Sequence, residues 1–277
     1  NGYQVAFMVP TEILAEQHYY NLLTYTKGLH NSITGREVRV ELYMGKTPKK
    51  QKVKILQQLQ TGDIDIIVGT HSLIETKVKF KNLSLVIIDE QHKFGVIQRK
   101  KLYEKSVLPD ILIMTATPIP RTLAFGLEGI KDISVIETPP EGRLPIETYV
   151  LAYSEDIVLS AINRELHRNG QVYYVFNDIS LIQNKTNRIK KYFPTANVEF
   201  IHSKLPAKKI EDIMIRFINK EIQILVTTTI IESGLDIPSV NTIIVENAER
   251  FGLAQLYQLR GRVGRRSTKA YCYFLYS

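Results

Sequence analysis

Short apolar runs of strand length alternate along this chain with longer segments whose apolar residues recur every three or four positions. This alternation is typical of crossover units, in which a helix returns the chain to a parallel neighbour in the same sheet. In the first half, Glu12–Tyr25 and Lys49–Leu59 have the helical period,. The runs predicted to be buried strands are Val5–Val9, Ile64–Val68, Leu85–Ile88 and Ile111–Met114. The sequence therefore predicts an α/β fold with mostly parallel sheets.

A proline-rich segment interrupts this alternation near the middle of the chain. Residues 138–146 contain three prolines and one glycine, which cannot continue a helix or a central strand. We therefore expect an interdomain linker at 138–146, a first domain at 1–137 and a second at 147–277. The chain length of 277 residues fits two domains of ordinary size,.

The alternation restarts after the linker, so the second domain is also expected to be α/β. The two halves show no evident residue-level repeat, and we expect them to share only their architecture. The expected elements are the strands Gln171–Phe176, Val198–Ile201, Ile224–Thr227, Thr242–Val245 and Tyr271–Leu275 and the helices Leu181–Tyr192 and Ala207–Phe217.

The formal net charge of +8 is dispersed along the chain and forms no basic tail. Such an excess is compatible with nucleic acid or another polyanion as a partner. Cys272 is the only cysteine, which excludes an internal disulfide framework and a cysteine-rich zinc site and favours the reducing cytoplasm. No apolar run approaches the roughly 18–20 residues that a membrane span needs, so no membrane partner is expected. His18 and His30 lack metal-ligand spacing, and we expect no metal site at either.

Two carboxylates, Asp89 and Glu90, directly follow the predicted strand Leu85–Ile88. Such a strand delivers Asp89 to the carboxyl edge of a sheet, where a hard Mg²⁺ ion takes oxygen ligands, usually through water. Glu90 can then orient or deprotonate an attacking water. The alternative is a strand followed by an acidic turn that carries no chemistry.

Glycines and arginines are interspersed between Gln258 and Arg265, near the end of the chain. A planar, permanently charged guanidinium can stabilise negative charge on a transferring phosphoryl group. Arg262 and Arg265 are the candidates for that role. A solvated basic turn, or plain phosphate contacts to nucleic acid, would explain the same residues.

The segment Asp89–His92 resembles motif II of the superfamily 2 helicases. Further segments resemble the companions that this motif requires, in the required order: 10–15 (motif Ia), 69–71 (Ib), 115–118 (III), 228–238 (V) and 258–265 (VI). The resemblance implies two tandem RecA-like lobes with mostly parallel sheets.

The resemblance also implies a role for each matched residue. The implied catalytic residues are Asp89, Glu90, Gln91, His92, Arg262 and Arg265. Those implied to bind ATP, with Mg²⁺ held by Asp89 through water, are Asp89, Gly234, Asp236, Gln258, Arg262 and Arg265. Those implied to couple the nucleotide site to the second lobe are Thr115, Ala116 and Thr117. Those implied to contact the DNA backbone are Pro10, Thr11, Gly69, Thr70, His71, His202, Ser203, Thr228 and Thr229.

Two longer matches, 89–99 and 115–122, narrow the resemblance to the RecG-type branch-migration helicases and the transcription-repair coupling factors, sister families that share one motor core. Residues 10–18 and Gln91 favour RecG, whereas residues 171–178 look more like the coupling factor. We favour RecG, because the nucleotide-side motifs lie in the first lobe.

The resemblance to RecG implies an ATP-dependent motor that moves along double-stranded DNA in repair and recombination and remodels stalled forks and Holliday junctions. Double-stranded and branched DNA would be its partners, and ATP its only small-molecule substrate. The coupling factor would instead displace a stalled RNA polymerase, which would then be a partner. An alternative of another class is a nucleic-acid-binding module that has lost catalysis.

One element of the resembled families is missing. Their first lobe opens with Gly-x-x-x-x-Gly-Lys-Ser/Thr, which holds the phosphates, and no such segment occurs in the 277 residues. Gly45-Lys46-Thr47 lacks the required earlier glycine, because Val40 stands there, and is predicted to be a surface turn. We therefore expect a first lobe that is truncated at its amino end, and negligible ATP hydrolysis by this chain alone.

Overall fold

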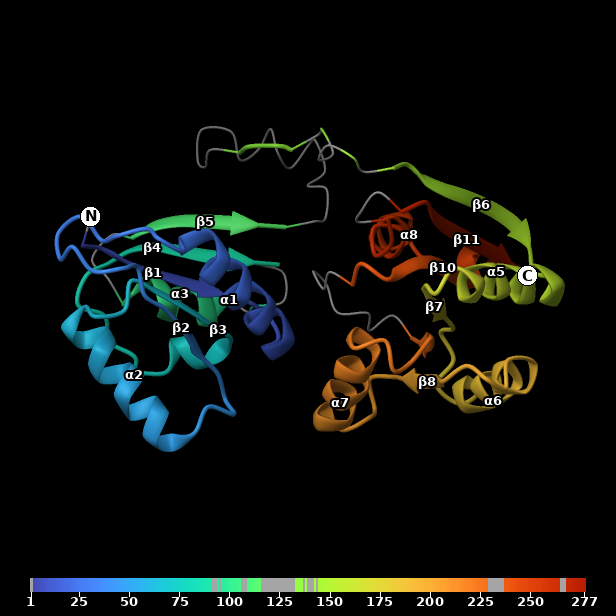
Figure 1. The fold of residues 1–277 in the computed structure, drawn as a ribbon, viewed down its shortest axis with the longest axis horizontal. Helices are drawn as coiled ribbons and strands as arrows, with labels where there is room; N and C mark the ends of the chain where they lie inside the picture. Colours follow the sequence, from blue (N-terminus) through green and yellow to red (C-terminus); the bar gives the residue numbers. More distant parts are fainter. Residues whose placement is uncertain are drawn as a thin grey trace. The chain divides into compact units, whose positions relative to one another are not determined.

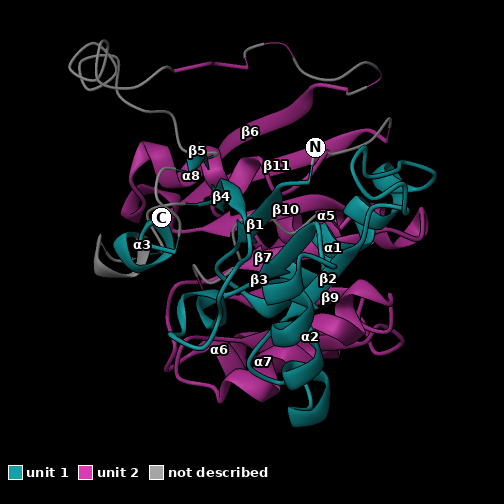
Figure 2. Cartoon of the chain, turned by 90° about the vertical axis from the view of Figure 1, so that its left-hand side faces the viewer, with its two compact units in different colours: residues 1–116, 233–235 teal, residues 117–232, 236–277 magenta. Residues whose placement is uncertain are grey.

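The computed structural model describes residues 2–90, 94, 96–105, 109–115, 133–136, 138, 142, 144–228, 237–264 and 268–277, and only the backbone of 96–99. The described residues fall into two compact units, one up to residue 115 and one from residue 133 onward (Figure 2). Residues 139–141 and 143 lie outside the described part, so the linker and the domain boundaries stay predictions. Within the part of the chain that the structure describes, none of the helices has both the length and the apolar character needed to cross a bilayer.

Unit 1 is built around a sheet whose described strands number five, in the order β2-β3-β1-β4-β5 (Figure 1). Each strand pairs in parallel with its neighbours, as expected where helices connect successive strands. The strands are β1 (Gln4–Met8), β2 (Val40–Tyr43), β3 (Ile66–Gly69), β4 (Leu83–Asp89) and β5 (Asp110–Met114). The helices are α1 (Glu12–Thr26), α2 (Lys49–Thr61), α3 (Val96–Tyr103) and the 3₁₀ helix η1 (His71–Ile74).

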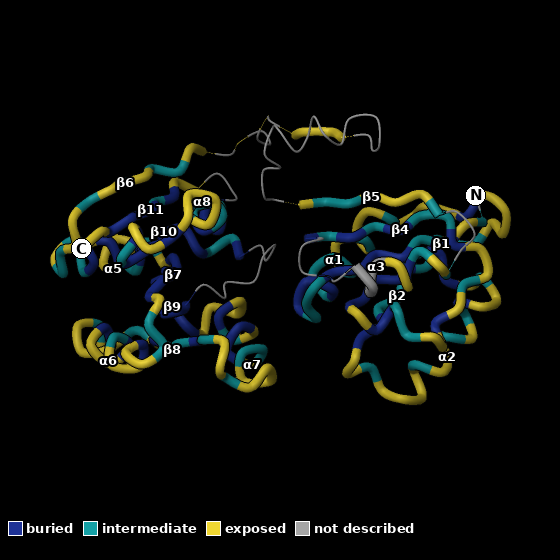
Figure 3. The backbone as a smooth tube through the Cα atoms, turned by 180° about the vertical axis from the view of Figure 1, so that it is seen from behind, coloured by how far each residue is buried: buried dark blue, intermediate teal, exposed yellow. Residues whose placement is uncertain are grey.

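The central strands of unit 1 are continuous apolar runs because they are buried on both faces. Met8 of β1 and Ile88 of β4 are fully buried and share one core with Leu59 of α2. At the edge of the sheet, β5 leaves Ile111 and Leu112 45% and 47% exposed. Figure 3 shows this contrast between the buried centre and the exposed edge.

Unit 2 has a second parallel sheet, whose described strands number six, in the order β6-β11-β10-β7-β9-β8. The strands are β6 (Ile146–Ala152), β7 (Gln171–Val175), β8 (Val198–Ile201), β9 (Ile224–Thr227), β10 (Val240–Glu246) and β11 (Ala270–Tyr276). The helices are α5 (Glu155–His167), α6 (Ile182–Tyr192), α7 (Ala207–Ile218), α8 (Leu253–Arg260) and the 3₁₀ helix η3 (Ala248–Arg250).

The predicted α/β class and the parallel sheets are confirmed, and the buried strands lie close to their predicted bounds. β2, β6, α3, α5 and α8 were not among the predicted elements. β6 is an edge strand with exposed residues such as Val150, 67% exposed, so it does not form a buried run. α8 has eight residues, which is too short for an apolar period to identify a helix.

A buried glutamine anchors the amino end of the central strand β1. The Nε2 of Gln4 donates to the carbonyl oxygens of Leu59 and Ile64 at 3.0 and 2.9 Å. Its Oε1 accepts from the backbone N–H groups of Lys81 and Asn82 at 2.8 and 3.0 Å. One side chain therefore joins the end of α2 and the segments that enter β3 and β4.

The same anchor recurs in unit 2. The Nε2 of Gln171, at the start of β7, donates to the carbonyl oxygens of Phe217 and Ile222 at 2.7 and 2.6 Å. The intervening turns also match, because Gly62 and Lys220 both have a left-handed backbone, with φ of 83° and 63°. The expectation that the two halves share only their architecture is therefore wrong for this helix–turn–strand segment.

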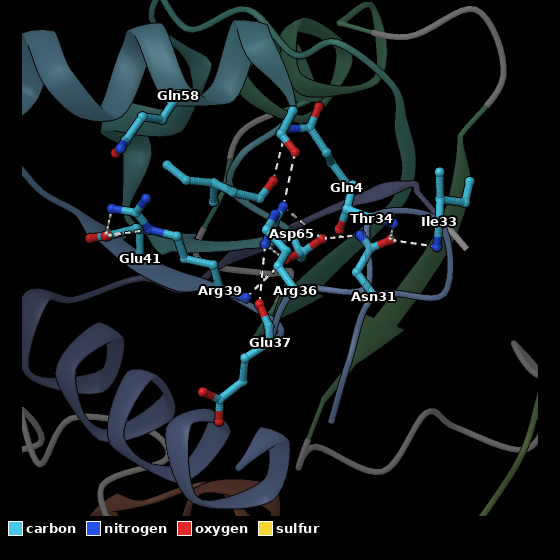
Figure 4. Close-up of polar contacts among 12 residues, drawn as sticks. Gln4, Asn31, Ile33, Thr34, Arg36, Glu37, Arg39, Glu41, Gln58 and Asp65 are labelled. Atoms are coloured by element: carbon cyan, nitrogen blue, oxygen red, sulfur yellow. Dashed lines mark hydrogen bonds and ion pairs between the residues drawn. The ribbon is translucent and has the colours of Figure 1, made fainter. Parts of the chain in front are cut away.

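A second polar network lies at the amino end of β3 (Figure 4). The carboxylate of Asp65 accepts from Nδ2 of Asn31 and Nη1 of Arg36, both at 2.6 Å, and from the backbone N–H of Arg39 at 2.8 Å. These bonds attach the loop before β2 to the sheet. They lie at the edge opposite the carboxyl ends of the strands, where ligands bind in open parallel sheets.

Candidate functional site

Four neighbouring strands of unit 1 end at one edge of its sheet, and a segment singled out in the sequence follows each. The N–H of Val9 donates to the carbonyl of Gly69 at 3.0 Å, and the N–H of Glu90 to that of Met114 at 2.9 Å. The segments therefore leave the sheet side by side. The residues that follow β1, β3, β4 and β5 are, in turn, Pro10 and Thr11, Thr70 and His71, Glu90, and Thr115.

Glu90 has a backbone conformation that glutamate rarely adopts. Its φ of 50° lies in the left-handed region, which costs a non-glycine residue roughly 1–2 kcal/mol and occurs in turns and at active sites. The residue is 2% exposed, and the Oγ1 of Thr115 donates to its Oε2 at 3.5 Å. The structure thus brings the predicted water-activating residue together with a predicted coupling residue.

Asp89, the predicted Mg²⁺ ligand, contacts a histidine that the sequence did not point to. The Nε2 of His18 in α1 lies 3.4 Å from Oδ2 of Asp89, and the two side chains are 22% and 16% exposed. The ring of His18 packs on Phe7, with centroids 4.6 Å apart. Metal-ligand spacing could not reveal this contact, because it joins α1 to β4. The available signal was the position of His18 on the helix that leaves the same sheet edge.

The loop after β3 buries part of the predicted DNA-contacting set. Thr70 is 2% exposed, and among the described residues its Oγ1 has no hydrogen-bond partner. A Cβ on Gly69 would lie 2.3 Å from the carbonyl oxygen of Tyr43, so β2 and this loop approach too closely for any other residue. His71 is exposed and is the side chain that this loop presents to solvent.

Gly45-Lys46-Thr47 forms a turn between β2 and α2, as predicted. The Nζ of Lys46 lies 3.5 Å from a carboxylate oxygen of Glu12 and 3.1 Å from one of Glu16. The Oγ1 of Thr47 accepts from the N–H of Met44 at 3.0 Å. The lysine is therefore paired with the side chains of α1, and the turn is not a phosphate-binding loop.

In unit 2, the predicted nucleic-acid residues also follow adjacent strands. His202 and Ser203 come after β8 and Thr228 after β9, and the N–H of Thr228 donates to the carbonyl of Ile201 at 3.3 Å. The ring of His202 stacks on Phe200, and its Nδ1 accepts from a backbone N–H at 3.3 Å. Thr228 is 3% exposed, so His202 and Ser203 are the more accessible groups.

Two predicted residues of the arginine motif lie on α8 and the turn after it. Gln258 is half-buried, and Arg262 is 8% exposed with its N–H bonded to the carbonyl of Leu259 at 3.0 Å. Gly264 has a φ of 70°, which favours glycine at this position. The predicted residues that lie outside the described part are Gln91, His92, Ala116, Thr117, Thr229, Gly234, Asp236 and Arg265.

A cavity of about 660 Å³ in unit 2 includes Arg260 of α8 in its wall but none of the predicted site residues that the structure describes. Val150, Leu256, Tyr257 and Phe274 give it a mostly apolar wall. An apolar wall of this kind does not suit a triphosphate, whose charged oxygens need donors and cations.

The donor set of unit 1 suits a hard divalent cation. Asp89 offers carboxylate oxygens at the sheet edge, and Mg²⁺ in nucleotide sites takes one or two carboxylates and completes its octahedron with water and phosphate oxygens. The carboxylate of Glu90 is suited to act as a proton acceptor, because burial and the strained backbone hold it in one orientation. The geometry therefore fits phosphoryl transfer to water, with the phosphates held by groups other than these two.

Family comparisons agree with these features. Residues 1–125 match the DEAD/DEAH box helicase family, and residues 154–267 match the helicase conserved C-terminal domain. The transcription-repair-coupling factor of Staphylococcus haemolyticus is 45% identical over 276 residues, which cover 100% of this chain. That of Staphylococcus aureus is 46% identical over 276 residues.

Solved structures show the same architecture. A structure of RecG bound to a three-way DNA junction superposes with a TM-score of 0.82 at 39% identity and covers 99% of this chain. The Mycobacterium smegmatis helicase Lhr, at 17% identity and a TM-score of 0.70, shares the fold. The chain spans 23% of the length of the coupling factors and 36% of the RecG chain.

Proposed function

The chain is a superfamily 2 helicase core of the group that contains RecG and the transcription-repair-coupling factors, and we propose that it is the motor of an ATP-driven translocase on double-stranded DNA. The observation that carries this proposal is the sheet edge of unit 1, where Asp89 ends β4, Glu90 follows it, and Thr115, which follows the adjacent β5, contacts Glu90. A motor of this kind works in the cytoplasm, where its DNA is.

In the proposed mechanism, Asp89 would hold Mg²⁺ through water, and Glu90 accepts a proton from the attacking water. Mg·ATP, when bound, supplies the phosphoryl group and the cation that neutralises its charge. The hydroxyl of Thr115 holds Glu90 in place. We propose that this bond couples the contact between Glu90 and the attacking water to the segment that begins at Thr115.

For unit 2, we propose that Arg262 and Arg265 stabilise charge on the transferring phosphoryl group. Gly234, Asp236 and Gln258 are proposed to complete the nucleotide site. Burial of Arg262, which is 8% exposed, supports this role, because a guanidinium held by its surroundings loses little entropy when it meets a phosphate.

The proposed DNA contacts are made to phosphates and not to bases. The accessible candidates are Pro10, Thr11 and His71 in unit 1 and His202 and Ser203 in unit 2. Backbone N–H groups of the same loops, and the net charge of +8, add sequence-independent attraction. The logarithm of the binding constant for duplex DNA should therefore fall linearly with the logarithm of salt concentration, and affinity should vary little with sequence.

The test of the proposal is the variant Glu90→Gln in the full-length protein. We expect DNA-stimulated ATP hydrolysis to fall roughly 100-fold or more, because general-base catalysis is lost, while binding of ATP and DNA stays unchanged. Glu104→Gln, at the exposed end of α3, is the matched control and should keep full activity. Normal turnover by Glu90→Gln would remove the role assigned to Glu90.

We also propose that the 277-residue chain alone hydrolyses ATP negligibly. Its sequence has no Gly-x-x-x-x-Gly-Lys-Ser/Thr segment. In addition, β5 exposes the apolar side chains of Ile111 and Leu112, which is typical of a strand that usually pairs with a further strand. A steady-state ATPase assay with and without duplex DNA measures this directly. DNA-stimulated turnover by the chain alone would contradict the proposal.

The first candidate use of this motor is remodelling of stalled forks and Holliday junctions. The motif Ia segment and Gln91 support it, as does the similarity to RecG. The second candidate is displacement of stalled RNA polymerase, which the 45–46% identity to coupling factors supports. Fork regression and polymerase-displacement assays on the full-length protein separate the two, with Glu90→Gln as the inactive control in each.

A further inference from the structure

The contact between His18 and Asp89 joins three elements of unit 1 at its sheet edge. His18 belongs to α1, Asp89 ends β4, and Phe7 of β1 packs against the imidazole ring with centroids 4.6 Å apart and planes tilted by 47°. Phe7 is 6% exposed and offers no polar atom, so it sets where the ring lies without competing for its nitrogens. The ring is therefore held so that Nε2 lies 3.4 Å from Oδ2 of Asp89.

A carboxylate that holds a cation through water must keep its oxygens in a set direction, because each bridging water has to meet both partners. An aspartate at the end of a strand can rotate about two side-chain bonds. A neighbouring donor that engages one oxygen reduces this freedom, and in metal sites such supporting donors commonly change affinity or activity 10- to 100-fold.

We propose that His18 is the positioning residue of Asp89: its Nε2–H group holds Oδ2 and thereby sets the orientation of the carboxylate for Mg·ATP. The inference rests on the proposed function for the role of Asp89, but the contact itself does not depend on hydrolysis. His18 acts through Asp89 and touches no reacting atom.

Two variants distinguish this role from simple packing. His18→Gln keeps an N–H donor near the position of Nε2 but loses the ring, whereas His18→Phe keeps a ring on Phe7 and loses the donor. In the full-length protein, we expect His18→Phe to raise the Mg²⁺ concentration for half-maximal ATPase activity roughly 10-fold, and His18→Gln to stay within about threefold of the wild type. Thermal melting confirms that both variants fold.

A second measurement uses the 277-residue chain and requires no activity. With ¹⁵N-labelled histidine, Asp89→Asn should shift the Nε2 signal of His18 and leave the signals of His30, His167 and His202 in place; His18→Gln assigns the signal. Asp110→Asn, at the start of β5, is the control and should shift none of them.

The outcomes separate the two proposals. The positioning role is supported if His18→Phe raises the Mg²⁺ concentration for half-maximal activity and His18→Gln does not, and if Asp89→Asn shifts the Nε2 signal of His18. The reverse order of the two variants, equal effects in both, or an unchanged His18 signal would overturn it. If the full-length wild type hydrolyses no ATP, the proposed function fails, and the nuclear magnetic resonance result still decides whether His18 engages Asp89.

Discussion

At the scale of single residues, the sheet edge of unit 1 depends on backbone positions that few residue types tolerate. Glu90 is left-handed with a φ of 50°, and Gly69 leaves no room for a Cβ. Glu90 directly follows β4 and Gly69 ends β3. At both positions the chain must turn away from the sheet within one residue. The positions of the neighbouring side chains follow from these turns.

Gly69→Ala should destabilise unit 1 by roughly 1–3 kcal/mol, because the new methyl group would overlap the carbonyl of Tyr43 and the backbone must shift. Urea unfolding followed by circular dichroism measures the change. Gly45→Ala is the matched control, since the nearest atom to its Cβ is a flexible Glu12 oxygen at 3.3 Å. Equal midpoints for Gly69→Ala and Gly45→Ala would contradict the steric argument.

At the scale of elements, both units use one glutamine to join a helix end to the sheet. Gln4 and Gln171 are 2% and 1% exposed. Each donates to two carbonyl groups, one in the last turn of a helix and one in the segment that follows the helix. Helix ends leave carbonyls without intrahelical partners, so a buried end needs such a donor. The recurrence of this anchor indicates that the helix–turn–strand segment is the shared building block of the two units.

Gln4→Ala and Gln171→Ala should each lower the free energy of unfolding by about 1–3 kcal/mol, because the carbonyl of Ile64 or of Ile222 loses its side-chain donor,. The loss should be larger for Gln4→Ala, since Oε1 of Gln4 accepts from two backbone N–H groups, whereas Oε1 of Gln171 accepts from the hydroxyl of Ser239. Gln57→Ala, on the exposed face of α2, should change stability little. Wild-type stability of Gln4→Ala or Gln171→Ala would contradict the anchoring role of that glutamine.

At the scale of the whole molecule, each unit forms its own core. Tyr174 of β7 and Leu275 of β11 belong to the core of unit 2, and Met8 and Ile88 belong to that of unit 1. Cys272 of β11 is fully buried, and burial raises the pKa of its thiol from 9.0 to about 12. Since the thiolate is the reactive form, alkylation of Cys272 reports the unfolding of unit 2.

We expect iodoacetamide to label Cys272 only after unit 2 unfolds, and Gly69→Ala to leave this protection unchanged. The raised pKa of Cys272 also stabilises the folded state below about pH 9, a contribution that is lost as the pH rises from 9 towards 12,. Urea midpoints of the wild type and Cys272→Ala, compared across this range, measure the difference. Faster labelling in Gly69→Ala would show that the two cores unfold together.

The sequence by itself determined the features that depend on neighbours along the chain. Apolar runs predicted the buried strands, and the residues after them, such as Glu90 and Thr115, necessarily lie at the carboxyl edge of a parallel sheet,. The turn at Gly45-Lys46-Thr47 was predicted for the same local reason. Edge strand β6 was not, because a half-exposed strand lacks a buried run.

Contacts between side chains from distant segments depend on the packed fold. The contacts of Asp89 with His18 and of Glu90 with Thr115 join segments that approach each other through strand pairing and helix packing. The burial of Thr70 depends on how closely the loop after β3 packs against the end of β2. Distances between residues far apart in the chain are set by the sum of all packing contacts, and no local pattern encodes that sum.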